Sequence, residues 1–268
     1  MPVSEAREKV QKAPAQLVEA EIRAFVRTSP LNRVPLCKNR FIFEAPLVQF
    51  SGGDDPIFVE FKKIIDPTHL TPREALAKTY SQSPEKVAAK VSVISWILPV
   101  ARSIKTANRE RKLTPSRVWS YTRFYGEKFN DALRAQVVKL LTDLGYLAVA
   151  PPLQPFFDRT DYTQKLDRYF SNWSERHIAY AAGLGTFSLS DGFITEAGIA
   201  HRCGSVVTNL VLPDSPRTVT NPFANCLFYV NRKCQACILR CPAEAITEKG
   251  HDKMKCVAYM ESKRAPPW

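Results

Sequence analysis

Cysteine is the residue of this sequence whose type and spacing indicate a specific chemistry. The chain of 268 residues has seven cysteines, and five of them lie near its C-terminal end. These five are Cys226, Cys234, Cys237, Cys241 and Cys256. Because the total is odd and no apolar export signal is visible, we do not expect a set of disulfides. Grouped free thiolates instead bind soft metals or iron–sulfur clusters.

The spacing of three of these cysteines is typical of an iron–sulfur protein. The motif reads Cys234-x2-Cys237-x3-Cys241-Pro242. It matches most of the run C-x2-C-x2-C-x3-C-P, with which bacterial ferredoxins hold 4Fe–4S clusters. Asn231 stands where that run has its first cysteine, and Cys226, five residues earlier, is the obvious replacement. We therefore expect at least one 4Fe–4S cluster at this end of the chain.

The spacing leaves open whether the chain holds one cluster or two. A cube takes four thiolates, and in two-cluster ferredoxins the cysteine before the proline serves the other cluster. One arrangement joins Cys226, Cys234 and Cys237 with either of the two later cysteines. Another gives Cys241 and Cys256 to a second cluster. A zinc site is the alternative, because the four cysteines from Cys234 onward also supply four thiolates, but the Cys-Pro ending favours iron–sulfur.

The elements that must position these residues follow from the pattern of apolar side chains. Helices are expected over 2–28, from Thr71 through Lys78, over 119–145, over 172–182 and at 243–246. Strands are expected over 91–99, 147–150 and 206–212. The helices are predicted from apolar residues three and four positions apart, and the strands from short runs of β-branched residues. This mixture predicts an α+β fold, with a larger domain over 1–220 and a small ferredoxin-like 4Fe–4S module over 221–268.

Charge and hydropathy limit the partners and the location. The chain has 38 Lys and Arg against 26 Asp and Glu, a formal net charge of +12. Such a charge favours an anionic partner, such as nucleic acid, a phosphorylated cofactor or an acidic redox protein. The densest basic stretch, 102–117, is equally typical of a solvated helix face. No apolar run approaches the ~20 residues needed to cross a bilayer, so we expect a cytoplasmic protein without membrane association.

Several segments, in this order, resemble a known family. They are Ser-Val-Ile-Ser-Trp-Ile-Leu-Pro at 92–99, Ala-Tyr-Ala-Ala-Gly-Leu-Gly at 179–185, Gly-Ser-Val-Val-Thr at 204–208, the cysteine run ending in Cys-Pro, and Lys-Cys-Val-Ala-Tyr at 255–259. The order resembles that of epoxyqueuosine reductase, and corrinoid-dependent reductive dehalogenases share it. The resemblance covers roughly residues 90–260.

The resemblance implies an oxidoreductase with a nitroreductase-like cobalamin domain in front of the iron–sulfur module. Electrons from a donor such as a ferredoxin or flavodoxin would pass through the cluster or clusters to a cobalamin. The cobalamin would reduce a small molecule or a modified nucleoside, and transfer RNA is a possible substrate that is not assumed. The residues expected to bind the cobalamin are Gly183, Leu184, Gly185, His201, Gly204 and Ser205.

The resemblance also implies a proton donor shortly before the helix that ends in Gly-Leu-Gly. Counted without gaps, the position of the family's aspartate falls on Tyr169, and a small shift brings Asp167 there. Glu175 matches a glutamate of the family. Two alternative functions stay open: a non-catalytic electron carrier or reductive activator of a corrinoid protein, and a nucleic-acid-binding protein whose cluster is structural.

Overall fold

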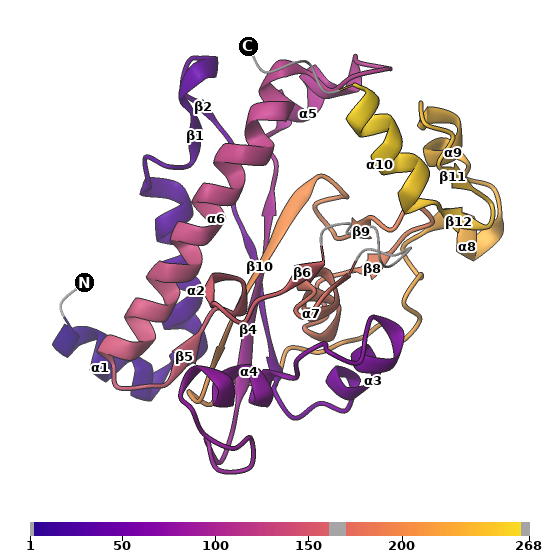
Figure 1. Ribbon diagram of the computed structural model, residues 1–268. Coiled ribbons are helices and arrows are strands. Elements are labelled where there is room, and N and C mark those ends of the chain that lie inside the picture. Colours follow the sequence, from indigo (N-terminus) through magenta and orange to yellow (C-terminus); the bar gives the residue numbers. More distant parts are fainter. Residues whose placement is uncertain (1–2, 161–169, 264–268) are drawn as a thin grey trace.

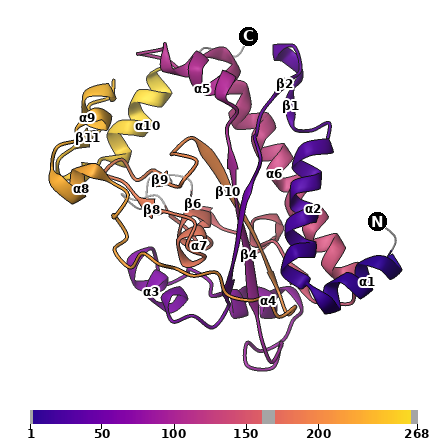
Figure 2. The same ribbon diagram turned by 180° about the vertical axis from the view of Figure 1, so that it is seen from behind.

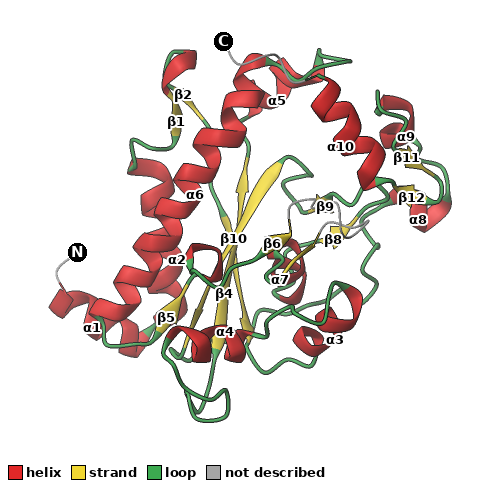
Figure 3. Ribbon diagram, in the orientation of Figure 1, coloured by secondary structure: helices red, strands yellow, loops and turns green. Residues whose placement is uncertain are grey.

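A computed structural model describes residues 3–160 and 170–263, and a four-stranded antiparallel sheet lies at its centre (Figures 1 and 3). The order of the strands is β3-β4-β10-β5. Their bounds are Leu47–Gly52 for β3, Ser92–Pro99 for β4, His201–Thr208 for β10 and Ala148–Val149 for β5. β4 and β10 pair along their whole length, whereas β5 reaches only Val207 and Thr208 of β10. Among the described residues, most of the outer edge of β10 therefore has no neighbouring strand.

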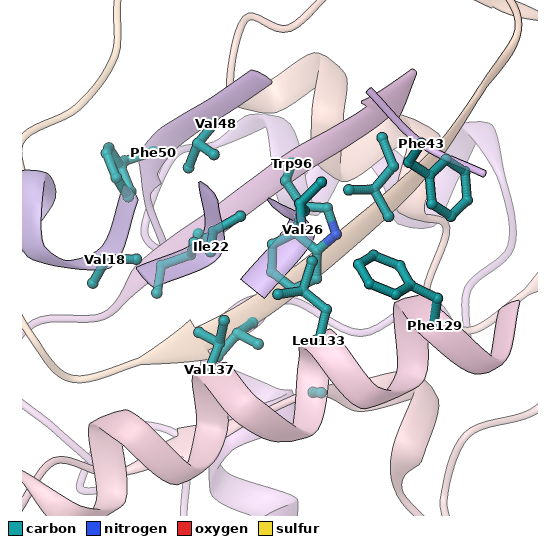
Figure 4. Close-up of a cluster of buried hydrophobic side chains, with 14 of the residues drawn as sticks. Val18, Ile22, Val26, Phe43, Val48, Phe50, Trp96, Phe129, Leu133 and Val137 are labelled. Atoms are coloured by element: carbon teal, nitrogen blue, oxygen red, sulfur yellow. The ribbon is translucent and has the colours of Figure 1, made fainter. Parts of the chain in front are cut away.

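Helices cover one face of the sheet. They are α1 (Val3–Lys12), α2 (Pro14–Thr28), α5 (Arg102–Arg109) and α6 (Arg117–Asp143). α6 begins at Ser116, whose side chain accepts a hydrogen bond from the backbone N–H of Trp119. Figure 4 shows Leu133 and Val137 of α6 pointing toward Ile22 of α2 and Trp96 of β4. This packing fixes α6 across the sheet, and it confirms the long helix predicted over 119–145 with a start two residues earlier.

A second helical layer covers the opposite face. It contains α3 (Ile57–Ile64), α4 (Pro72–Thr79) and the short α7 (Glu175–Ala181). α4 starts with the capping box formed by Thr71 and Glu74. Alternate residues of β4 serve the two layers: Ile94 and Trp96 face α6, whereas Val93 and Ile97 face α7. Because both faces are covered, all eight residues of β4 are buried, which explains why the strand is apolar apart from Ser92 and Ser95.

Short elements complete the larger part of the chain. The paired strands are β1 (Arg33–Val34) with β2 (Arg40–Phe41), β6 (Arg159–Thr160) with β7 (Phe170–Ser171), and β8 (Thr186–Phe187) with β9 (Phe193–Ile194). Two 3-10 turns are η1 (Pro35–Cys37) and η2 (Pro151–Leu153). The described helices include none that is both long and apolar enough to cross a membrane.

The C-terminal residues form a small unit beside the sheet, which we call the cysteine module (residues 221–263). It contains α8 (Leu227–Asn231), α9 (Ala236–Arg240), β11 (Ile246–Thr247), β12 (Gly250–His251) and α10 (Lys253–Ser262). α10 runs back toward the end of α5 (Figures 1 and 2). The helix predicted at 243–246 is wrong: Glu244 has a φ of 50°, which a helix does not tolerate, and Ile246 begins a hairpin instead.

The strand predicted over 206–212 needs a similar correction. β10 begins at His201 and ends at Thr208, so only the first three residues of the predicted strand belong to it. The side chain of Thr208 accepts a hydrogen bond from the N–H of Leu210, which turns the chain out of the sheet. Residues 201–204 were missed because His, Arg, Cys and Gly give no β-branched apolar pattern.

Candidate functional site

The cysteine module holds all five cysteines for which metal binding was predicted. Cys226 is buried at the N-terminal end of α8 and forms the small core of the module together with Phe228 and Leu189. Cys237 packs against this core, and the thiols of Cys234, Cys241 and Cys256 are half-buried. All seven cysteines are free. The loop between α8 and α9 therefore returns Cys237 to the neighbourhood of Cys226.

Electrostatic interactions divide the cysteines into two groups. Burial raises the pKa of Cys237, and the nearby thiolates of Cys226 and Cys234 raise it further. Burial also raises the pKa of Cys256, for which Cys241 is the neighbouring thiolate. Asn231, which occupies the place of the missing cysteine, accepts a hydrogen bond from the N–H of Lys233 at 3.0 Å. Its side chain therefore shapes the turn that leads to Cys234.

The thiols of the cysteine module lie near one another without meeting at one point in the described chain. Within residues 3–160 and 170–263, no three His, Cys, Asp or Glu side chains lie together closely enough to hold one metal ion. Cys237 feels the charges of Cys226 and Cys234, and Cys256 feels that of Cys241, which pairs the cysteines electrostatically into these two groups. Soft, free and partly buried sulfur donors spread over such groups fit an iron–sulfur cluster, whose irons are each held by one thiolate.

A second concentration of functional groups lies at the free edge of β10. In the part of the chain that the structure describes, no strand pairs with the carbonyl oxygen of Cys203 there, and two side chains of α6 donate to it instead. Asn130 Nδ2 lies 2.9 Å from this oxygen and Arg134 Nη2 lies 3.4 Å from it. The amide oxygen of Asn130 accepts a hydrogen bond from Trp96 Nε1 at 3.0 Å. Side chains of α6 therefore supply hydrogen bonds to the part of the β10 backbone with which β5 does not pair.

Arg134 links this edge to α7 on the other face of the sheet. Its side chain is 3% exposed, and its Nη2 lies 3.0 Å from the Oε1 of Glu175. The other carboxylate oxygen of Glu175 accepts a hydrogen bond from Ser205 at 2.7 Å, and Ser205 accepts one from Trp173 Nε1 at 3.0 Å. Burial raises the pKa of Glu175, although Arg134 and Ser205 oppose this effect. The carboxylate is thus held in one orientation at the start of α7.

Two further carboxylates balance the charge of Arg134. Its Nη1 lies 2.6 Å from Asp131 and 3.0 Å from Glu127, and Glu127 also pairs with Arg202. Burial would raise the pKa of Glu127, but the charges of Arg202 and Arg134 outweigh it and lower that pKa. The result is a connected network of two arginines and three carboxylates, which we call the edge network (Glu127, Asp131, Arg134, Glu175 and Arg202).

Two of the residues predicted to bind cobalamin are used by the protein itself. A Cβ on Gly204 would lie 2.4 Å from Trp96 Nε1 and 2.7 Å from Asn130 Oδ1, so this glycine faces α6 and admits the indole. Ser205 is fully buried, and its hydroxyl is engaged by Trp173 and Glu175. Their physical roles in this structure are close packing and hydrogen bonding.

Three other residues predicted to bind cobalamin follow the C-terminal end of α7. Gly183, Leu184 and Gly185 line a cavity of about 400 Å³ beside β3 and Arg217. A Cβ on Gly185 would come within 2.2 Å of the carbonyl oxygen of Ile194, so the backbone there already contacts its own chain. His201 does not line this cavity. In the described part of the chain, the six predicted residues are therefore not gathered around one pocket.

His201 has a distinct environment. Its ring centroid lies 6.1 Å from that of Phe193, and Phe193 also contacts Gly185. Burial lowers the pKa of His201 to about 4, with a smaller effect of Lys105. Its Nδ1 is buried without a hydrogen bond to a described residue. The buried Phe193 ring fills the space between His201 and the Gly183–Gly185 turn.

The predicted proton donors, Tyr169 and Asp167, lie outside the described residues. The chain on both sides of them is firmly placed, because β6 pairs with β7 and the side chain of Asn172 bonds to Phe156 and Asp158. β7 leads within a few residues to Glu175. Sequence reasoning named Glu175 but missed Arg134, which is one of many charged residues in α6 and has no motif around it.

No protein-family model matches the chain, and no curated protein matches it. Matching solved structures include the crystal structure of a selenomethionine-labelled epoxyqueuosine reductase, with 14% identity over 92% of this chain and 58% of that one, and a TM-score of 0.43. They also include epoxyqueuosine reductase from Bacillus subtilis, with 15% identity over 82% of this chain and 54% of that one, and a TM-score of 0.36. The chain thus spans little more than half the length of either protein, and similarities at these scores assign no activity by themselves.

Proposed function

We propose that this protein is an iron–sulfur oxidoreductase of the epoxyqueuosine reductase type, in which the cysteine module accepts and passes on single electrons. The observation that carries the proposal is the return of Cys237 to the buried Cys226, with Cys234 beside them. Three soft donors that are separated in sequence lie near one another in this way, and all three are free thiols. When bound there, an iron–sulfur cluster would supply reversible one-electron transfer.

The two groups of thiols suggest how ligands would be shared. We assign Cys226, Cys234 and Cys237 to one cluster, and Cys241 and Cys256 to a second. The assignment agrees with ferredoxin runs, in which the cysteine before the proline serves the other cluster. Each group is smaller than the four thiolates that a cube takes, so both clusters would need further ligands from outside these groups.

The described residues expected to bind cobalamin do not surround one pocket. Gly204 and Ser205 are occupied by Trp96, Trp173 and Glu175, and we therefore derive no chemical step through a corrin. Within the chain itself, the edge network holds the carboxylate of Glu175 in place at the start of α7. Tyr169 and Asp167 remain the proposed proton donors.

A second candidate function is a non-catalytic electron carrier or reductive activator. The observation that favours it is the position of the cysteine module at the side of the molecule, with half-buried thiols and exposed apolar residues around them. A carrier needs such an accessible redox centre and needs no substrate pocket. The proposed localisation is cytoplasmic in either case, and the proposed electron donor is a ferredoxin or flavodoxin.

The first experiment is the iron, sulfide, zinc and cobalt content of protein purified without oxygen, incubated with hydroxocobalamin and desalted. We expect about four irons and four sulfides per cluster. Cys226→Ser should lose the iron of one cluster, whereas Cys37→Ser, outside the module, should keep all of it. Zinc in place of iron would overturn the proposal. About one retained cobalt per chain would establish cobalamin binding, and iron without cobalt would favour the carrier.

A further inference from the structure

The cysteine module exposes an unusual share of its apolar side chains. In α8, Phe228 is buried, but Leu227 and Val230 are each 58% exposed. Leu239, in α9 between Cys237 and Cys241, is 84% exposed. α8 and α9 lie at the end of the module farthest from α6 in both views (Figures 1 and 2). Apolar residues at this position, beside the proposed cluster ligands, indicate a surface that a partner covers.

Positive charge lies next to these apolar residues. The guanidinium of Arg232 stacks over the ring of Phe228 at 4.7 Å, which holds it against α8, and Lys233 follows it on the surface. Residues 221–263 have seven Lys and Arg against four Asp and Glu, and the whole chain has a net charge of +12. A second copy of the chain would be repelled by this charge, whereas an acidic protein would be attracted.

We propose that Leu227, Val230 and Leu239, with Arg232 and Lys233, form the docking surface for an acidic electron-carrier protein. This inference rests on the proposed function and names the partner of the same site. The apolar centre would exclude water and bring the two redox centres close, and the basic residues would steer the carrier into place. A flavodoxin hydroquinone would lose one electron and become the semiquinone, and an iron–sulfur cluster held by the cysteine module would gain that electron.

The test is the bimolecular rate at which flavodoxin hydroquinone reduces the anaerobically purified protein, measured by stopped-flow absorbance. We expect Leu239→Asp to lower this rate at least about tenfold, because a carboxylate replaces the apolar contact and repels the acidic carrier. Lys233→Glu should lower it about threefold and flatten its salt dependence. The matched control is Leu36→Asp, since Leu36 is also 58% exposed but lies in η1, far along the chain from the module.

Reduction by dithionite tests the proposed iron–sulfur function separately from the proposed docking surface. Dithionite should reduce wild type and Leu239→Asp equally. If flavodoxin also reduces both at the same rate, the proposed docking surface is wrong and the iron–sulfur function stands. If the protein holds no iron and dithionite changes no absorbance, the proposed function fails, and the docking proposal fails with it. A stable dimer of the wild-type protein in size-exclusion chromatography, lost in Leu239→Asp, would show that a second copy covers this surface instead.

Discussion

The larger part of the chain and the cysteine module are held together in different ways. Among the described residues, the sheet separates two hydrophobic cores of 26 and 20 buried residues, whereas the core beneath the module has three, of which only Cys226 and Phe228 belong to the module itself. A core of three side chains supplies little of the free energy that ordering about forty residues requires. The comparison indicates that burial stabilises the sheet, whereas the module depends on its ligand for a defined conformation.

The largest effect should therefore follow from removing the metal. We expect that chelation of iron, or the variant Cys237→Ser, will speed amide hydrogen exchange in 226–262 at least about 100-fold. Exchange in β4, β10 and α6 should stay within about twofold, because their hydrophobic cores contain no cysteine ligand of the module. Hydrogen exchange with mass spectrometry measures both regions in one sample. Equal acceleration in β4 and β10 would show that the two regions unfold as one unit.

The next largest effect should come from the edge network. Arg134→Ala leaves Glu175 buried without its cation, and we expect it to lower the free energy of unfolding by about 3–5 kcal/mol. Arg27→Ala, an exposed position on α2, should change it by less than about 0.5 kcal/mol. Urea denaturation followed by fluorescence measures this difference.

A second substitution tests whether the loss of stability in Arg134→Ala comes from the unpaired carboxylate of Glu175. In an Arg134→Ala background, Glu175→Gln should recover part of the loss, because a neutral amide replaces the buried charge. Strictly additive costs for the two substitutions would show that Arg134 contributes through packing alone. The iron content of both variants should stay at the wild-type value, which would keep the two regions distinct.

These two regions also differ in how well the sequence predicts them. The cysteine spacing identified the ligand candidates because a cluster requires sulfur at fixed intervals along a short loop. The long apolar runs identified β4 and α6, since burial on two faces or along one stripe determines their pattern. The edge network was not predicted, because it exists only where β5 ends early and α6 covers the bare edge of β10. Such a tertiary contact leaves no local pattern in the sequence.

A pH effect of intermediate size is expected from the layer around α7. His69 is fully buried, and its Nε2 accepts a hydrogen bond from the N–H of Ser174. Burial, with a smaller contribution from Lys62, lowers its pKa from 6.5 to about 4. The unfolded chain therefore binds a proton below pH 6.5 that the folded protein binds only near pH 4, so stability falls as pH falls through this window.

Urea denaturation at several pH values measures how much the protonation of His69 changes the free energy of unfolding. Between pH 7 and pH 5, His69 alone should lower the free energy of unfolding by about 2 kcal/mol. His69→Gln should lose this dependence, although it is less stable at pH 7. Parallel pH profiles for wild type and variant would show that His69 is protonated equally in both states. The cysteine module should contribute little, since its stability rests on its ligand.

The smallest effect concerns the contact between the two regions. Tyr259 on α10 donates its hydroxyl to the carbonyl oxygen of Leu113 at 3.0 Å, and Arg240 donates to the carbonyls of Arg109 and Arg111 at 2.9 Å. These bonds tie the helix of Cys256 and the loop of Cys241 to the basic segment after α5. Tyr259→Phe removes one exposed hydrogen bond, which costs about 0.5–1 kcal/mol.

Limited proteolysis with trypsin measures this contact, because the segment contains Arg109, Arg111 and Lys112. We expect Tyr259→Phe to raise the rate of cleavage there about two- to fivefold, and Arg240→Gln to raise it further. Tyr229→Phe is the matched control, since the hydroxyl of Tyr229 has no partner among the described residues. Removal of iron should reproduce the effect of Arg240→Gln if the ligand orders the module and the module in turn holds this segment. An unchanged cleavage rate after iron removal would mean that the contact forms without the ligand, and the module would then have more stability of its own than its small core indicates.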